Sequence, residues 1–198
     1  YVAHLGGPEI FGQMVWAEAA RRDWEQAADT EAIGDGAPWI WNLTLEHFYD
    51  SRQVVDWYHA TEHLAGVARL LKDDEGLAEK RWYNARETTL IEGQAARIAQ
   101  ELEAAARTQP SIAKELEKEA GYFRKNQRRM KYQEMREEGW AIGSGMVESA
   151  AKQFKARFAG PGMRWSRPGA ERLIPVRAAI MSRRFDDLWH TAYNSPPN

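Results

Sequence analysis

The 198-residue chain contains no cysteine, so it forms no disulfide, offers no thiolate to a metal and has no cysteine nucleophile. It also lacks an apolar run near the roughly 20 residues that span a bilayer, and its start has no signal-peptide pattern. We therefore expect a soluble, cytoplasmic protein without a membrane partner. The first residue is Tyr1 rather than Met, which suggests a fragment whose upstream part is missing.

Charge of each sign is concentrated in a different part of the chain. Residues 1–120 hold 12 Lys and Arg against 22 Asp and Glu, whereas residues 121–184 hold 15 against 5. Such a basic segment favours an anionic partner, and nucleic acid is the first candidate. A solvated helix face is the alternative explanation.

Asp35 follows a short extended run, residues 31–34, and precedes a helix predicted over 38–48. Glycines on both sides allow a tight exit from the strand, and Pro38 suits a first helical turn. Open α/β sheets place ligand-binding side chains at this position, outside the carboxyl ends of their strands. The alternative is a helix N-cap, the commonest use of Asp before a helix.

A second strand is predicted over residues 52–57, again near a carboxylate and followed by a helix over 58–71. Two strand–carboxylate–helix units in succession indicate a parallel βαβ arrangement. The rest of the chain has helical periodicity. Helices are predicted over the ranges 8–22, 91–105, 111–121 and 122–138, and a last pair is predicted before a disordered tail at 191–198.

Glu148 follows the glycine-flanked Ser144 and opens another predicted helix, 113 residues after Asp35. Only a folded chain can bring the two carboxylates together. Paired Mg²⁺ ions held by carboxylates can drive an in-line displacement at phosphorus. The cations that follow Glu148 would then hold the phosphate backbone.

Several motifs, in this order along the chain, resemble the ISKra family of bacterial insertion-sequence transposases. They are Gly34-Asp35-Gly36-Ala37-Pro38-Trp39-Ile40-Trp41-Asn42, Val55-Asp56-Trp57-Tyr58-His59-Ala60, Tyr122-Phe123 with Asn126 and Arg129-Met130, Gly143-Ser144-Gly145-Met146-Val147-Glu148-Ser149, and Gly162-Met163-Arg164-Trp165-Ser166. The similarity covers nearly the whole chain.

The resemblance implies an α/β, ribonuclease H-like DDE domain that lacks its first strands and carries a helical insertion and a helical C-terminus. Residues 1–75 would be a partial catalytic core, 76–138 the insertion, and 139–190 the rest of the core with basic helices. The enzyme would cleave and transfer DNA strands during transposition. Its partners would be transposon-end and target DNA and, in the complete enzyme, further copies of itself.

By the same resemblance, Asp35 is the second catalytic aspartate and Glu148 the catalytic glutamate, and both are ligands of Mg²⁺ or Mn²⁺. Asp56 and His59 match a D-x-x-H pair with a supporting role beside the metals. No residue fits the first catalytic aspartate. We therefore expect that this chain does not cut or join DNA by itself.

Two other interpretations stay open. His59, Glu62 and His63 match H-x-x-E-H, an inverted zinc-peptidase motif. The chain could instead be a non-catalytic or domesticated DNA-binding domain. The cations that would contact phosphates in either DNA-binding interpretation are Arg124, Arg128, Arg129, Lys152, Lys155, Arg157 and Arg164.

Overall fold

The computed structural model describes residues 1–71 and 77–194. It divides the chain into a central unit, Asp29–Ser144, and a terminal unit formed by Tyr1–Ala28 together with Gly145–Asn198. The boundaries predicted at residues 75 and 138 fall inside the central unit. Residues 195–198 of the predicted disordered tail lie outside the described residues.

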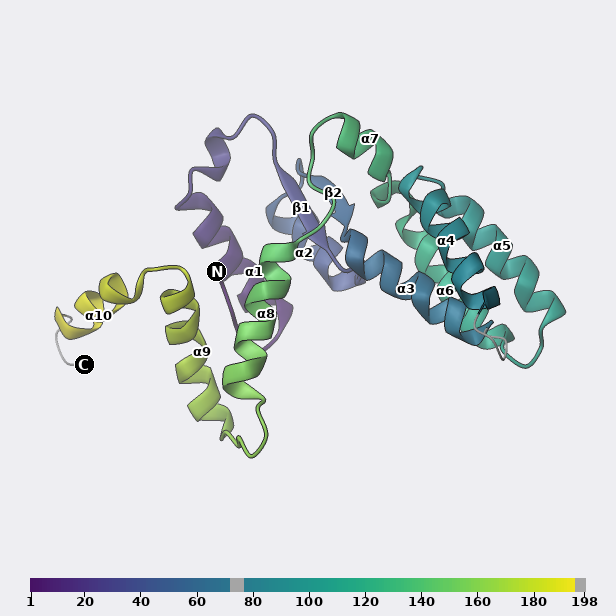
Figure 1. Cartoon of the computed structure of the whole chain (residues 1–198). Helices are drawn as coiled ribbons and strands as arrows, with labels where there is room; N and C mark the ends of the chain where they lie inside the picture. The colour runs from purple at the N-terminus through teal and green to yellow at the C-terminus, as the bar shows by residue number, and fades with distance from the viewer. Residues whose placement is uncertain (72–76, 195–198) are drawn as a thin grey trace. The chain divides into compact units, whose positions relative to one another are not determined.

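The central unit contains one pair of strands and most of the helices (Figure 1). Its elements are β1 (Glu31–Gly34), α2 (Pro38–His47), β2 (Arg52–Val55), α3 (Trp57–Leu70), α4 (Leu77–Ile91), α5 (Ala95–Thr108), α6 (Ala113–Asn126), the 3₁₀ turn η2 (Gln127–Arg129) and α7 (Tyr132–Glu137). The terminal unit contains α1 (Pro8–Ala20), the 3₁₀ turn η1 (Trp24–Gln26), α8 (Gly145–Phe158), α9 (Arg167–Met181) and α10 (Phe185–Asn194).

The predicted α/β, ribonuclease H-like fold is wrong. The described residues form ten α-helices but only two strands of four residues each, so the chain is mostly helical. The physical reason lies in the sequence pattern: extended, apolar runs occur only at β1 and β2, and helical periodicity occupies nearly all the rest. The helices are therefore the main structure of the chain, and the strand pair is a small part of it.

The local prediction of a parallel strand pair is confirmed. β1 and β2 pair in parallel, with Glu31 opposite Arg52 and Gly34 opposite Val55. Parallel strands need a crossover connection, and α2 provides it. The pairing continues one residue further, because the Asp56 N–H donates to the Gly34 carbonyl at 2.7 Å. The two residues that follow the strands, Asp35 and Asp56, thus leave the same end of the sheet.

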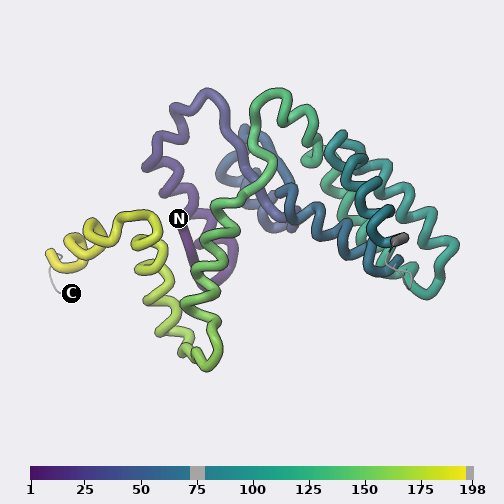
Figure 2. The backbone as a smooth tube through the Cα atoms, viewed as in Figure 1, coloured from purple at the N-terminus to yellow at the C-terminus, as the bar shows by residue number. Residues whose placement is uncertain are grey.

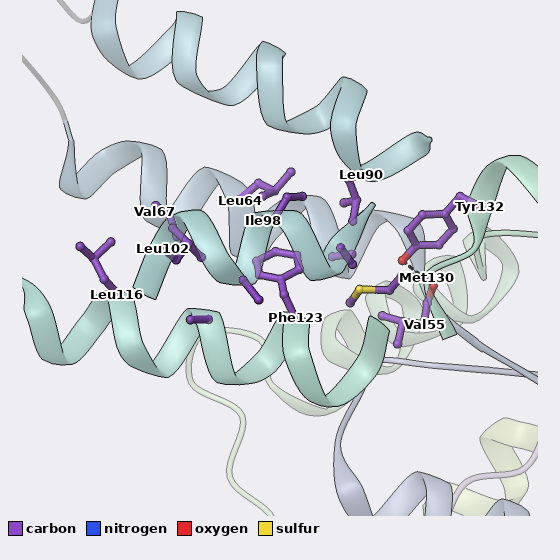
Figure 3. Close-up of a cluster of buried hydrophobic side chains, with 14 of the residues drawn as sticks. Val55, Leu64, Val67, Leu90, Ile98, Leu102, Leu116, Phe123, Met130 and Tyr132 are labelled. Carbon is purple, nitrogen blue, oxygen red and sulfur yellow. Dashed lines mark hydrogen bonds between the residues drawn. The ribbon is translucent and has the colours of Figure 1, made fainter. Parts of the chain in front are cut away.

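The core of the central unit lies among its helices. The tube in Figure 2 shows α3, α4, α5 and α6 side by side. Figure 3 shows side chains from these helices meeting Val55 of β2, with Leu64, Ile98 and Phe123 fully buried between them. The Tyr132 hydroxyl donates to the Val55 carbonyl at 3.0 Å and so ties α7 to β2.

Two helix boundaries differ from the prediction. Ile91 ends α4, and α5 begins only at Ala95, because Gly93 adopts a left-handed backbone (φ 77°) between them. In contrast, α6 continues through Gly121, where a helix end was predicted. A single glycine inside a helix lowers its stability by only about 1 kcal/mol, and the buried Leu116, Ala120 and Phe123 hold this one together.

The terminal unit is joined by polar contacts near its chain ends. The Tyr1 amino group donates to the Ser182 hydroxyl at 2.6 Å, and Arg184 pairs with Glu18 of α1 at 3.0 Å. Among residues 1–71 and 77–194, no helix is both long enough and apolar enough to cross a membrane.

Candidate functional sites

Asp35 lies in the tight turn between β1 and α2. Its side chain is exposed, and Oδ1 accepts a hydrogen bond from the Ala37 N–H at 2.8 Å. The N-cap of α2 is Ala37, and no side chain caps this helix. The N-cap interpretation of Asp35 is therefore wrong, and the carboxylate instead stabilises its own turn, in the manner of Asp residues at loop positions.

The turn after Asp35 is fixed to α6. Gly36 has a left-handed backbone (φ 94°), and a Cβ there would lie 2.8 Å from the Tyr122 ring and 3.0 Å from the Asn126 amide. The Tyr122 hydroxyl donates to the Asp35 carbonyl at 3.1 Å. The buried Asn126 accepts from the Trp41 indole at 3.1 Å. These contacts position the Asp35 carboxylate without using it.

Asp56 has a different environment at the end of the neighbouring strand. It is only 5% exposed and caps α3, since Oδ1 accepts from the His59 N–H at 3.1 Å. Its Oδ2 accepts from the Ser144 N–H at 2.6 Å and from the Ser144 hydroxyl at 2.5 Å. Both carboxylate oxygens are thus bound by protein donors, and the segment before α8 is held against the start of α3.

His59 and His63 lie one turn apart on α3, with ring centroids 5.1 Å apart. His63 stacks on Tyr122 at 3.6 Å, and its Nδ1 lies 2.5 Å from Glu119 Oε2. Burial, followed by nearby carboxylates including that of Asp35, raises the pKa of Tyr122 well above its usual value. Tyr122 therefore stays protonated and able to donate to the Asp35 carbonyl.

The predicted metal ligands are not gathered together within the central unit. Asp56 has both oxygens occupied by protein donors, which leaves Asp35 as the exposed carboxylate at this end of the sheet. Glu148 is in the first turn of α8 and so belongs to the terminal unit. No cluster of three or more side chains that could hold a metal ion is found in residues 1–71 and 77–194. The side chains of the His59–Glu62–His63 motif therefore do not form such a cluster either. The metal roles stay predictions.

The seven cations expected on phosphates fall into three groups. Arg124 is paired with Glu103, with its Nε 2.8 Å from the carboxylate. Arg129 is held by Gln53 and Trp41, and Arg128 lies beside it on η2. The third group comprises the exposed cations of α8 and the following loop, Lys152, Lys155, Arg157 and Arg164.

Sequence reasoning missed the partners that hold these sites in place. Ser144 binds Asp56 from 88 residues away, and Glu119 binds His63 from 56 residues away. The chain carries one signal for a contact at Gly36: a glycine between two predicted elements, where backbone freedom is needed. Nothing in the sequence pattern indicates which residue approaches it.

No protein-family model matches the chain, and neither a curated protein nor a solved structure is significantly similar to it.

Proposed function

We propose that this chain binds DNA through its backbone phosphates, as a non-catalytic or partial component of a transposition system. The observation that carries the proposal is the set of cations on α8 and the loop after it. Lys152, Lys155, Arg157 and Arg164 are all exposed, and within residues 1–71 and 77–194 none has an ion-pair or hydrogen-bond partner for its side chain. Lys152 and Lys155, three residues apart, share a helix face.

The absence of carboxylate partners separates these four cations from those that the structure pairs with a glutamate. Glu18 accepts from Arg21, Arg22 and Arg184, and Glu101 accepts from Arg86 and Arg97. A cation that already has a carboxylate must give up that contact to bind phosphate. The cations of α8 and its loop can bind phosphates without such a loss.

The identity of the polyanion rests on the resemblance to ISKra transposases. Its motifs include Gly162-Met163-Arg164-Trp165-Ser166, so Arg164 belongs both to the family pattern and to the exposed cations. Phosphate contacts of this kind fix a protein on a duplex without reading its sequence. The proposal is therefore DNA binding with strong dependence on salt and little dependence on sequence.

The test measures duplex affinity at several salt concentrations for the chain and for the variant K152Q+K155Q+R157Q+R164Q. Each lost phosphate contact makes the negative slope of log K against log salt shallower by about 1. The slope of the variant should therefore be shallower than that of the parent by up to about 3–4. The matched control neutralises four exposed cations of the acidic helices α4–α6: K80Q+R107Q+K114Q+K118Q. The control should keep the parent slope. Equal slopes in all three proteins would refute the proposal.

Strand transfer is the second candidate, and one observation favours it: the exposed Asp35 carboxylate at the end of β1, in a turn held by Tyr122 and Asn126. Mg²⁺- or Mn²⁺-dependent cleavage of a duplex by the chain, abolished in Asp35→Asn, would support catalysis. We expect no cleavage by the chain alone, because no residue matches the first catalytic aspartate of the family that the chain resembles.

A further inference from the structure

A basic pocket lies at the amino end of β2, the opposite end of the strand from Asp56. The cavity has a volume of about 430 Å³. Its lining comes from the start of β2, the end of α6, η2 and α7, and it comprises Ser51, Arg52, Gln53, Lys125, Arg128, Arg129, Lys131, Glu134 and Met135. Five of these side chains are cationic and one is a carboxylate, so the pocket has a strongly positive potential.

Arg129 is the residue that makes this pocket unusual. Its guanidinium is half-buried, lies over the Trp41 ring at 4.6 Å and donates through Nε to Gln53 at 2.7 Å. Burial lowers its pKa, yet no carboxylate pairs with it among the described residues. A charge that is partly removed from water is stabilised by a partner of opposite sign. Arg129 is partly buried, is held in place by neutral groups and has no carboxylate partner among the described residues, so an anion is the partner that suits its remaining N–H groups.

The surrounding cations strengthen this indication. Lys125, Arg128 and Lys131 are exposed at the pocket, and none has a side-chain hydrogen bond or ion pair within residues 1–71 and 77–194. Arg52 is already positioned, since it pairs with Glu138 at 2.7 Å and lies over Trp140 at 4.7 Å. Five cations gathered around one cavity repel each other, and a bound anion would relieve that repulsion.

We propose that this pocket binds a single phosphate group, with Arg129 as the fixed donor and Arg128 and Lys131 closing on it. Guanidinium groups suit phosphate because they donate two parallel hydrogen bonds to its oxygens. The phosphate could be a phosphodiester of a nucleic acid or a free phosphate. This site is independent of the DNA contacts proposed for α8, because it uses different side chains in the other unit.

The test is a titration of the ¹⁵N-labelled full chain with inorganic phosphate, at constant ionic strength maintained with chloride. We expect saturable amide shifts confined to residues 51–53 and 125–135. In R128Q+K131Q, which changes two exposed side chains, phosphate should bind at least about tenfold more weakly, because two charge-assisted contacts are lost. The control K114Q+K118Q removes two exposed lysines of α6 that do not line the pocket and should bind phosphate like the parent.

A second titration with a short DNA duplex distinguishes the two sources of phosphate. If the duplex shifts the same amides and displaces inorganic phosphate, the pocket takes the nucleic-acid backbone. If phosphate binds there and the duplex does not displace it, the pocket takes a small phosphorylated molecule. Either result supports the site. Shifts that do not saturate, or equal phosphate affinity in R128Q+K131Q and the parent, would overturn it. Neither outcome depends on the four cations of α8 and its loop.

Discussion

The central and terminal units bury side chains of very different size. In the central unit, Tyr132, Phe123 and Leu64 are fully buried. In the described part of the terminal unit, the buried residues are Gly12 and four alanines, Ala150, Ala170, Ala178 and Ala179. Burial of a large apolar side chain contributes about 1.5–3 kcal/mol, and an alanine methyl far less. The central unit therefore holds most of the hydrophobic stabilisation.

Both units expose large apolar side chains and unpaired cations, and they differ in the polar residues that they bury. The terminal unit exposes Met146 (74%) and Val147 (61%), together with the unpaired cations of α8. The central unit also exposes Tyr49 (78%) and Arg128, but it buries polar side chains as well, as Asp56 and Asn126 show. Less packed parts of proteins open more readily and often carry binding surfaces. The central unit therefore provides the more stable framework of the chain, and we expect the terminal unit to open more readily.

The largest expected effect comes from matched aromatic truncations in the two units. Phe123→Ala removes a fully buried ring from the central core and should lower the free energy of unfolding of that unit by about 3–5 kcal/mol. Phe154 of α8 is half-buried and stacks on Phe158 with ring centroids 6.0 Å apart. Because its ring retains contact with water, Phe154→Ala should lower the stability of the terminal unit by no more than about 1–2 kcal/mol.

Hydrogen exchange followed by mass spectrometry measures the two units separately in one protein. Phe123→Ala should accelerate exchange throughout α3, α5 and α6, whereas Phe154→Ala should accelerate it in α8 and α9 alone. Faster exchange in α5 and α6 of Phe154→Ala, to the same extent as in Phe123→Ala, would mean that the two units unfold together and would break the comparison.

A smaller effect is expected from the two aspartates that end neighbouring strands of the central unit. Asp56→Asn keeps an oxygen for the α3 cap, but it places an NH₂ group against donors of Ser144. Leaving these partly buried donors unpaired should cost about 1–3 kcal/mol. Asp35→Asn is the matched control: its side chain is exposed, and an amide oxygen can still accept from Ala37, so the change should stay within about 0.5 kcal/mol.

Urea unfolding of both aspartate variants, followed by circular dichroism, gives these two values. Comparable losses in Asp35→Asn and Asp56→Asn would contradict the difference in burial on which the prediction rests. A loss in Asp56→Asn alone would show that internal polar contacts, as well as the aromatic core, stabilise the central unit.

These two aspartates also show how far the sequence could predict the molecule. Glycines, Pro38 and short apolar runs are local signals, and they correctly predicted β1, α2, β2 and α3. Asp35 and Asp56 share the same local pattern of strand, carboxylate and helix. Their roles differ because Ser144, 88 residues beyond Asp56, supplies two hydrogen-bond donors to Asp56 and none to Asp35. Contacts across such distances leave no trace in local periodicity, so the sequence could not show that Asp56 is buried against Ser144 while Asp35 stays exposed.

The predicted α/β fold class was also wrong because it depends on contacts between distant segments. Two strand–helix units indicate a parallel sheet, but the number of strands depends on whether further extended segments join them. In the described residues none does, and α3 to α6 build their own core instead. The basic pocket likewise combines Arg52 and Gln53 with a basic run that starts at Lys125, and only the folded chain brings these segments together.

The smallest expected effect concerns Glu18, which links α1 to the end of α9 in the terminal unit. Hydrogen bonding from Arg21, supported by Arg22 and Arg184, lowers the pKa of its carboxyl from 4.5 to about 2. Folding therefore favours the ionised carboxylate, and this contribution to stability is fully present above pH 4.5 and lost as the pH falls through about 2. At neutral pH, Glu18→Gln should cost about 1 kcal/mol, in the range of partly exposed ion pairs.

Hydrogen exchange in α1 and α9, measured at several pH values, tests this prediction. After correction for the intrinsic pH dependence of exchange, the difference between the parent and Glu18→Gln should be constant from pH 7 to about 4.5 and then shrink toward pH 2. Glu171→Gln breaks an exposed pair with Arg167 one turn away on α9 and is the matched control, with little expected change at any pH. A Glu18→Gln difference that stayed constant down to pH 2 would mean that the glutamine disturbs packing rather than removing a charge. The attachment of α1 would then depend on packing, as the core of the central unit does, and not on the charge of Glu18.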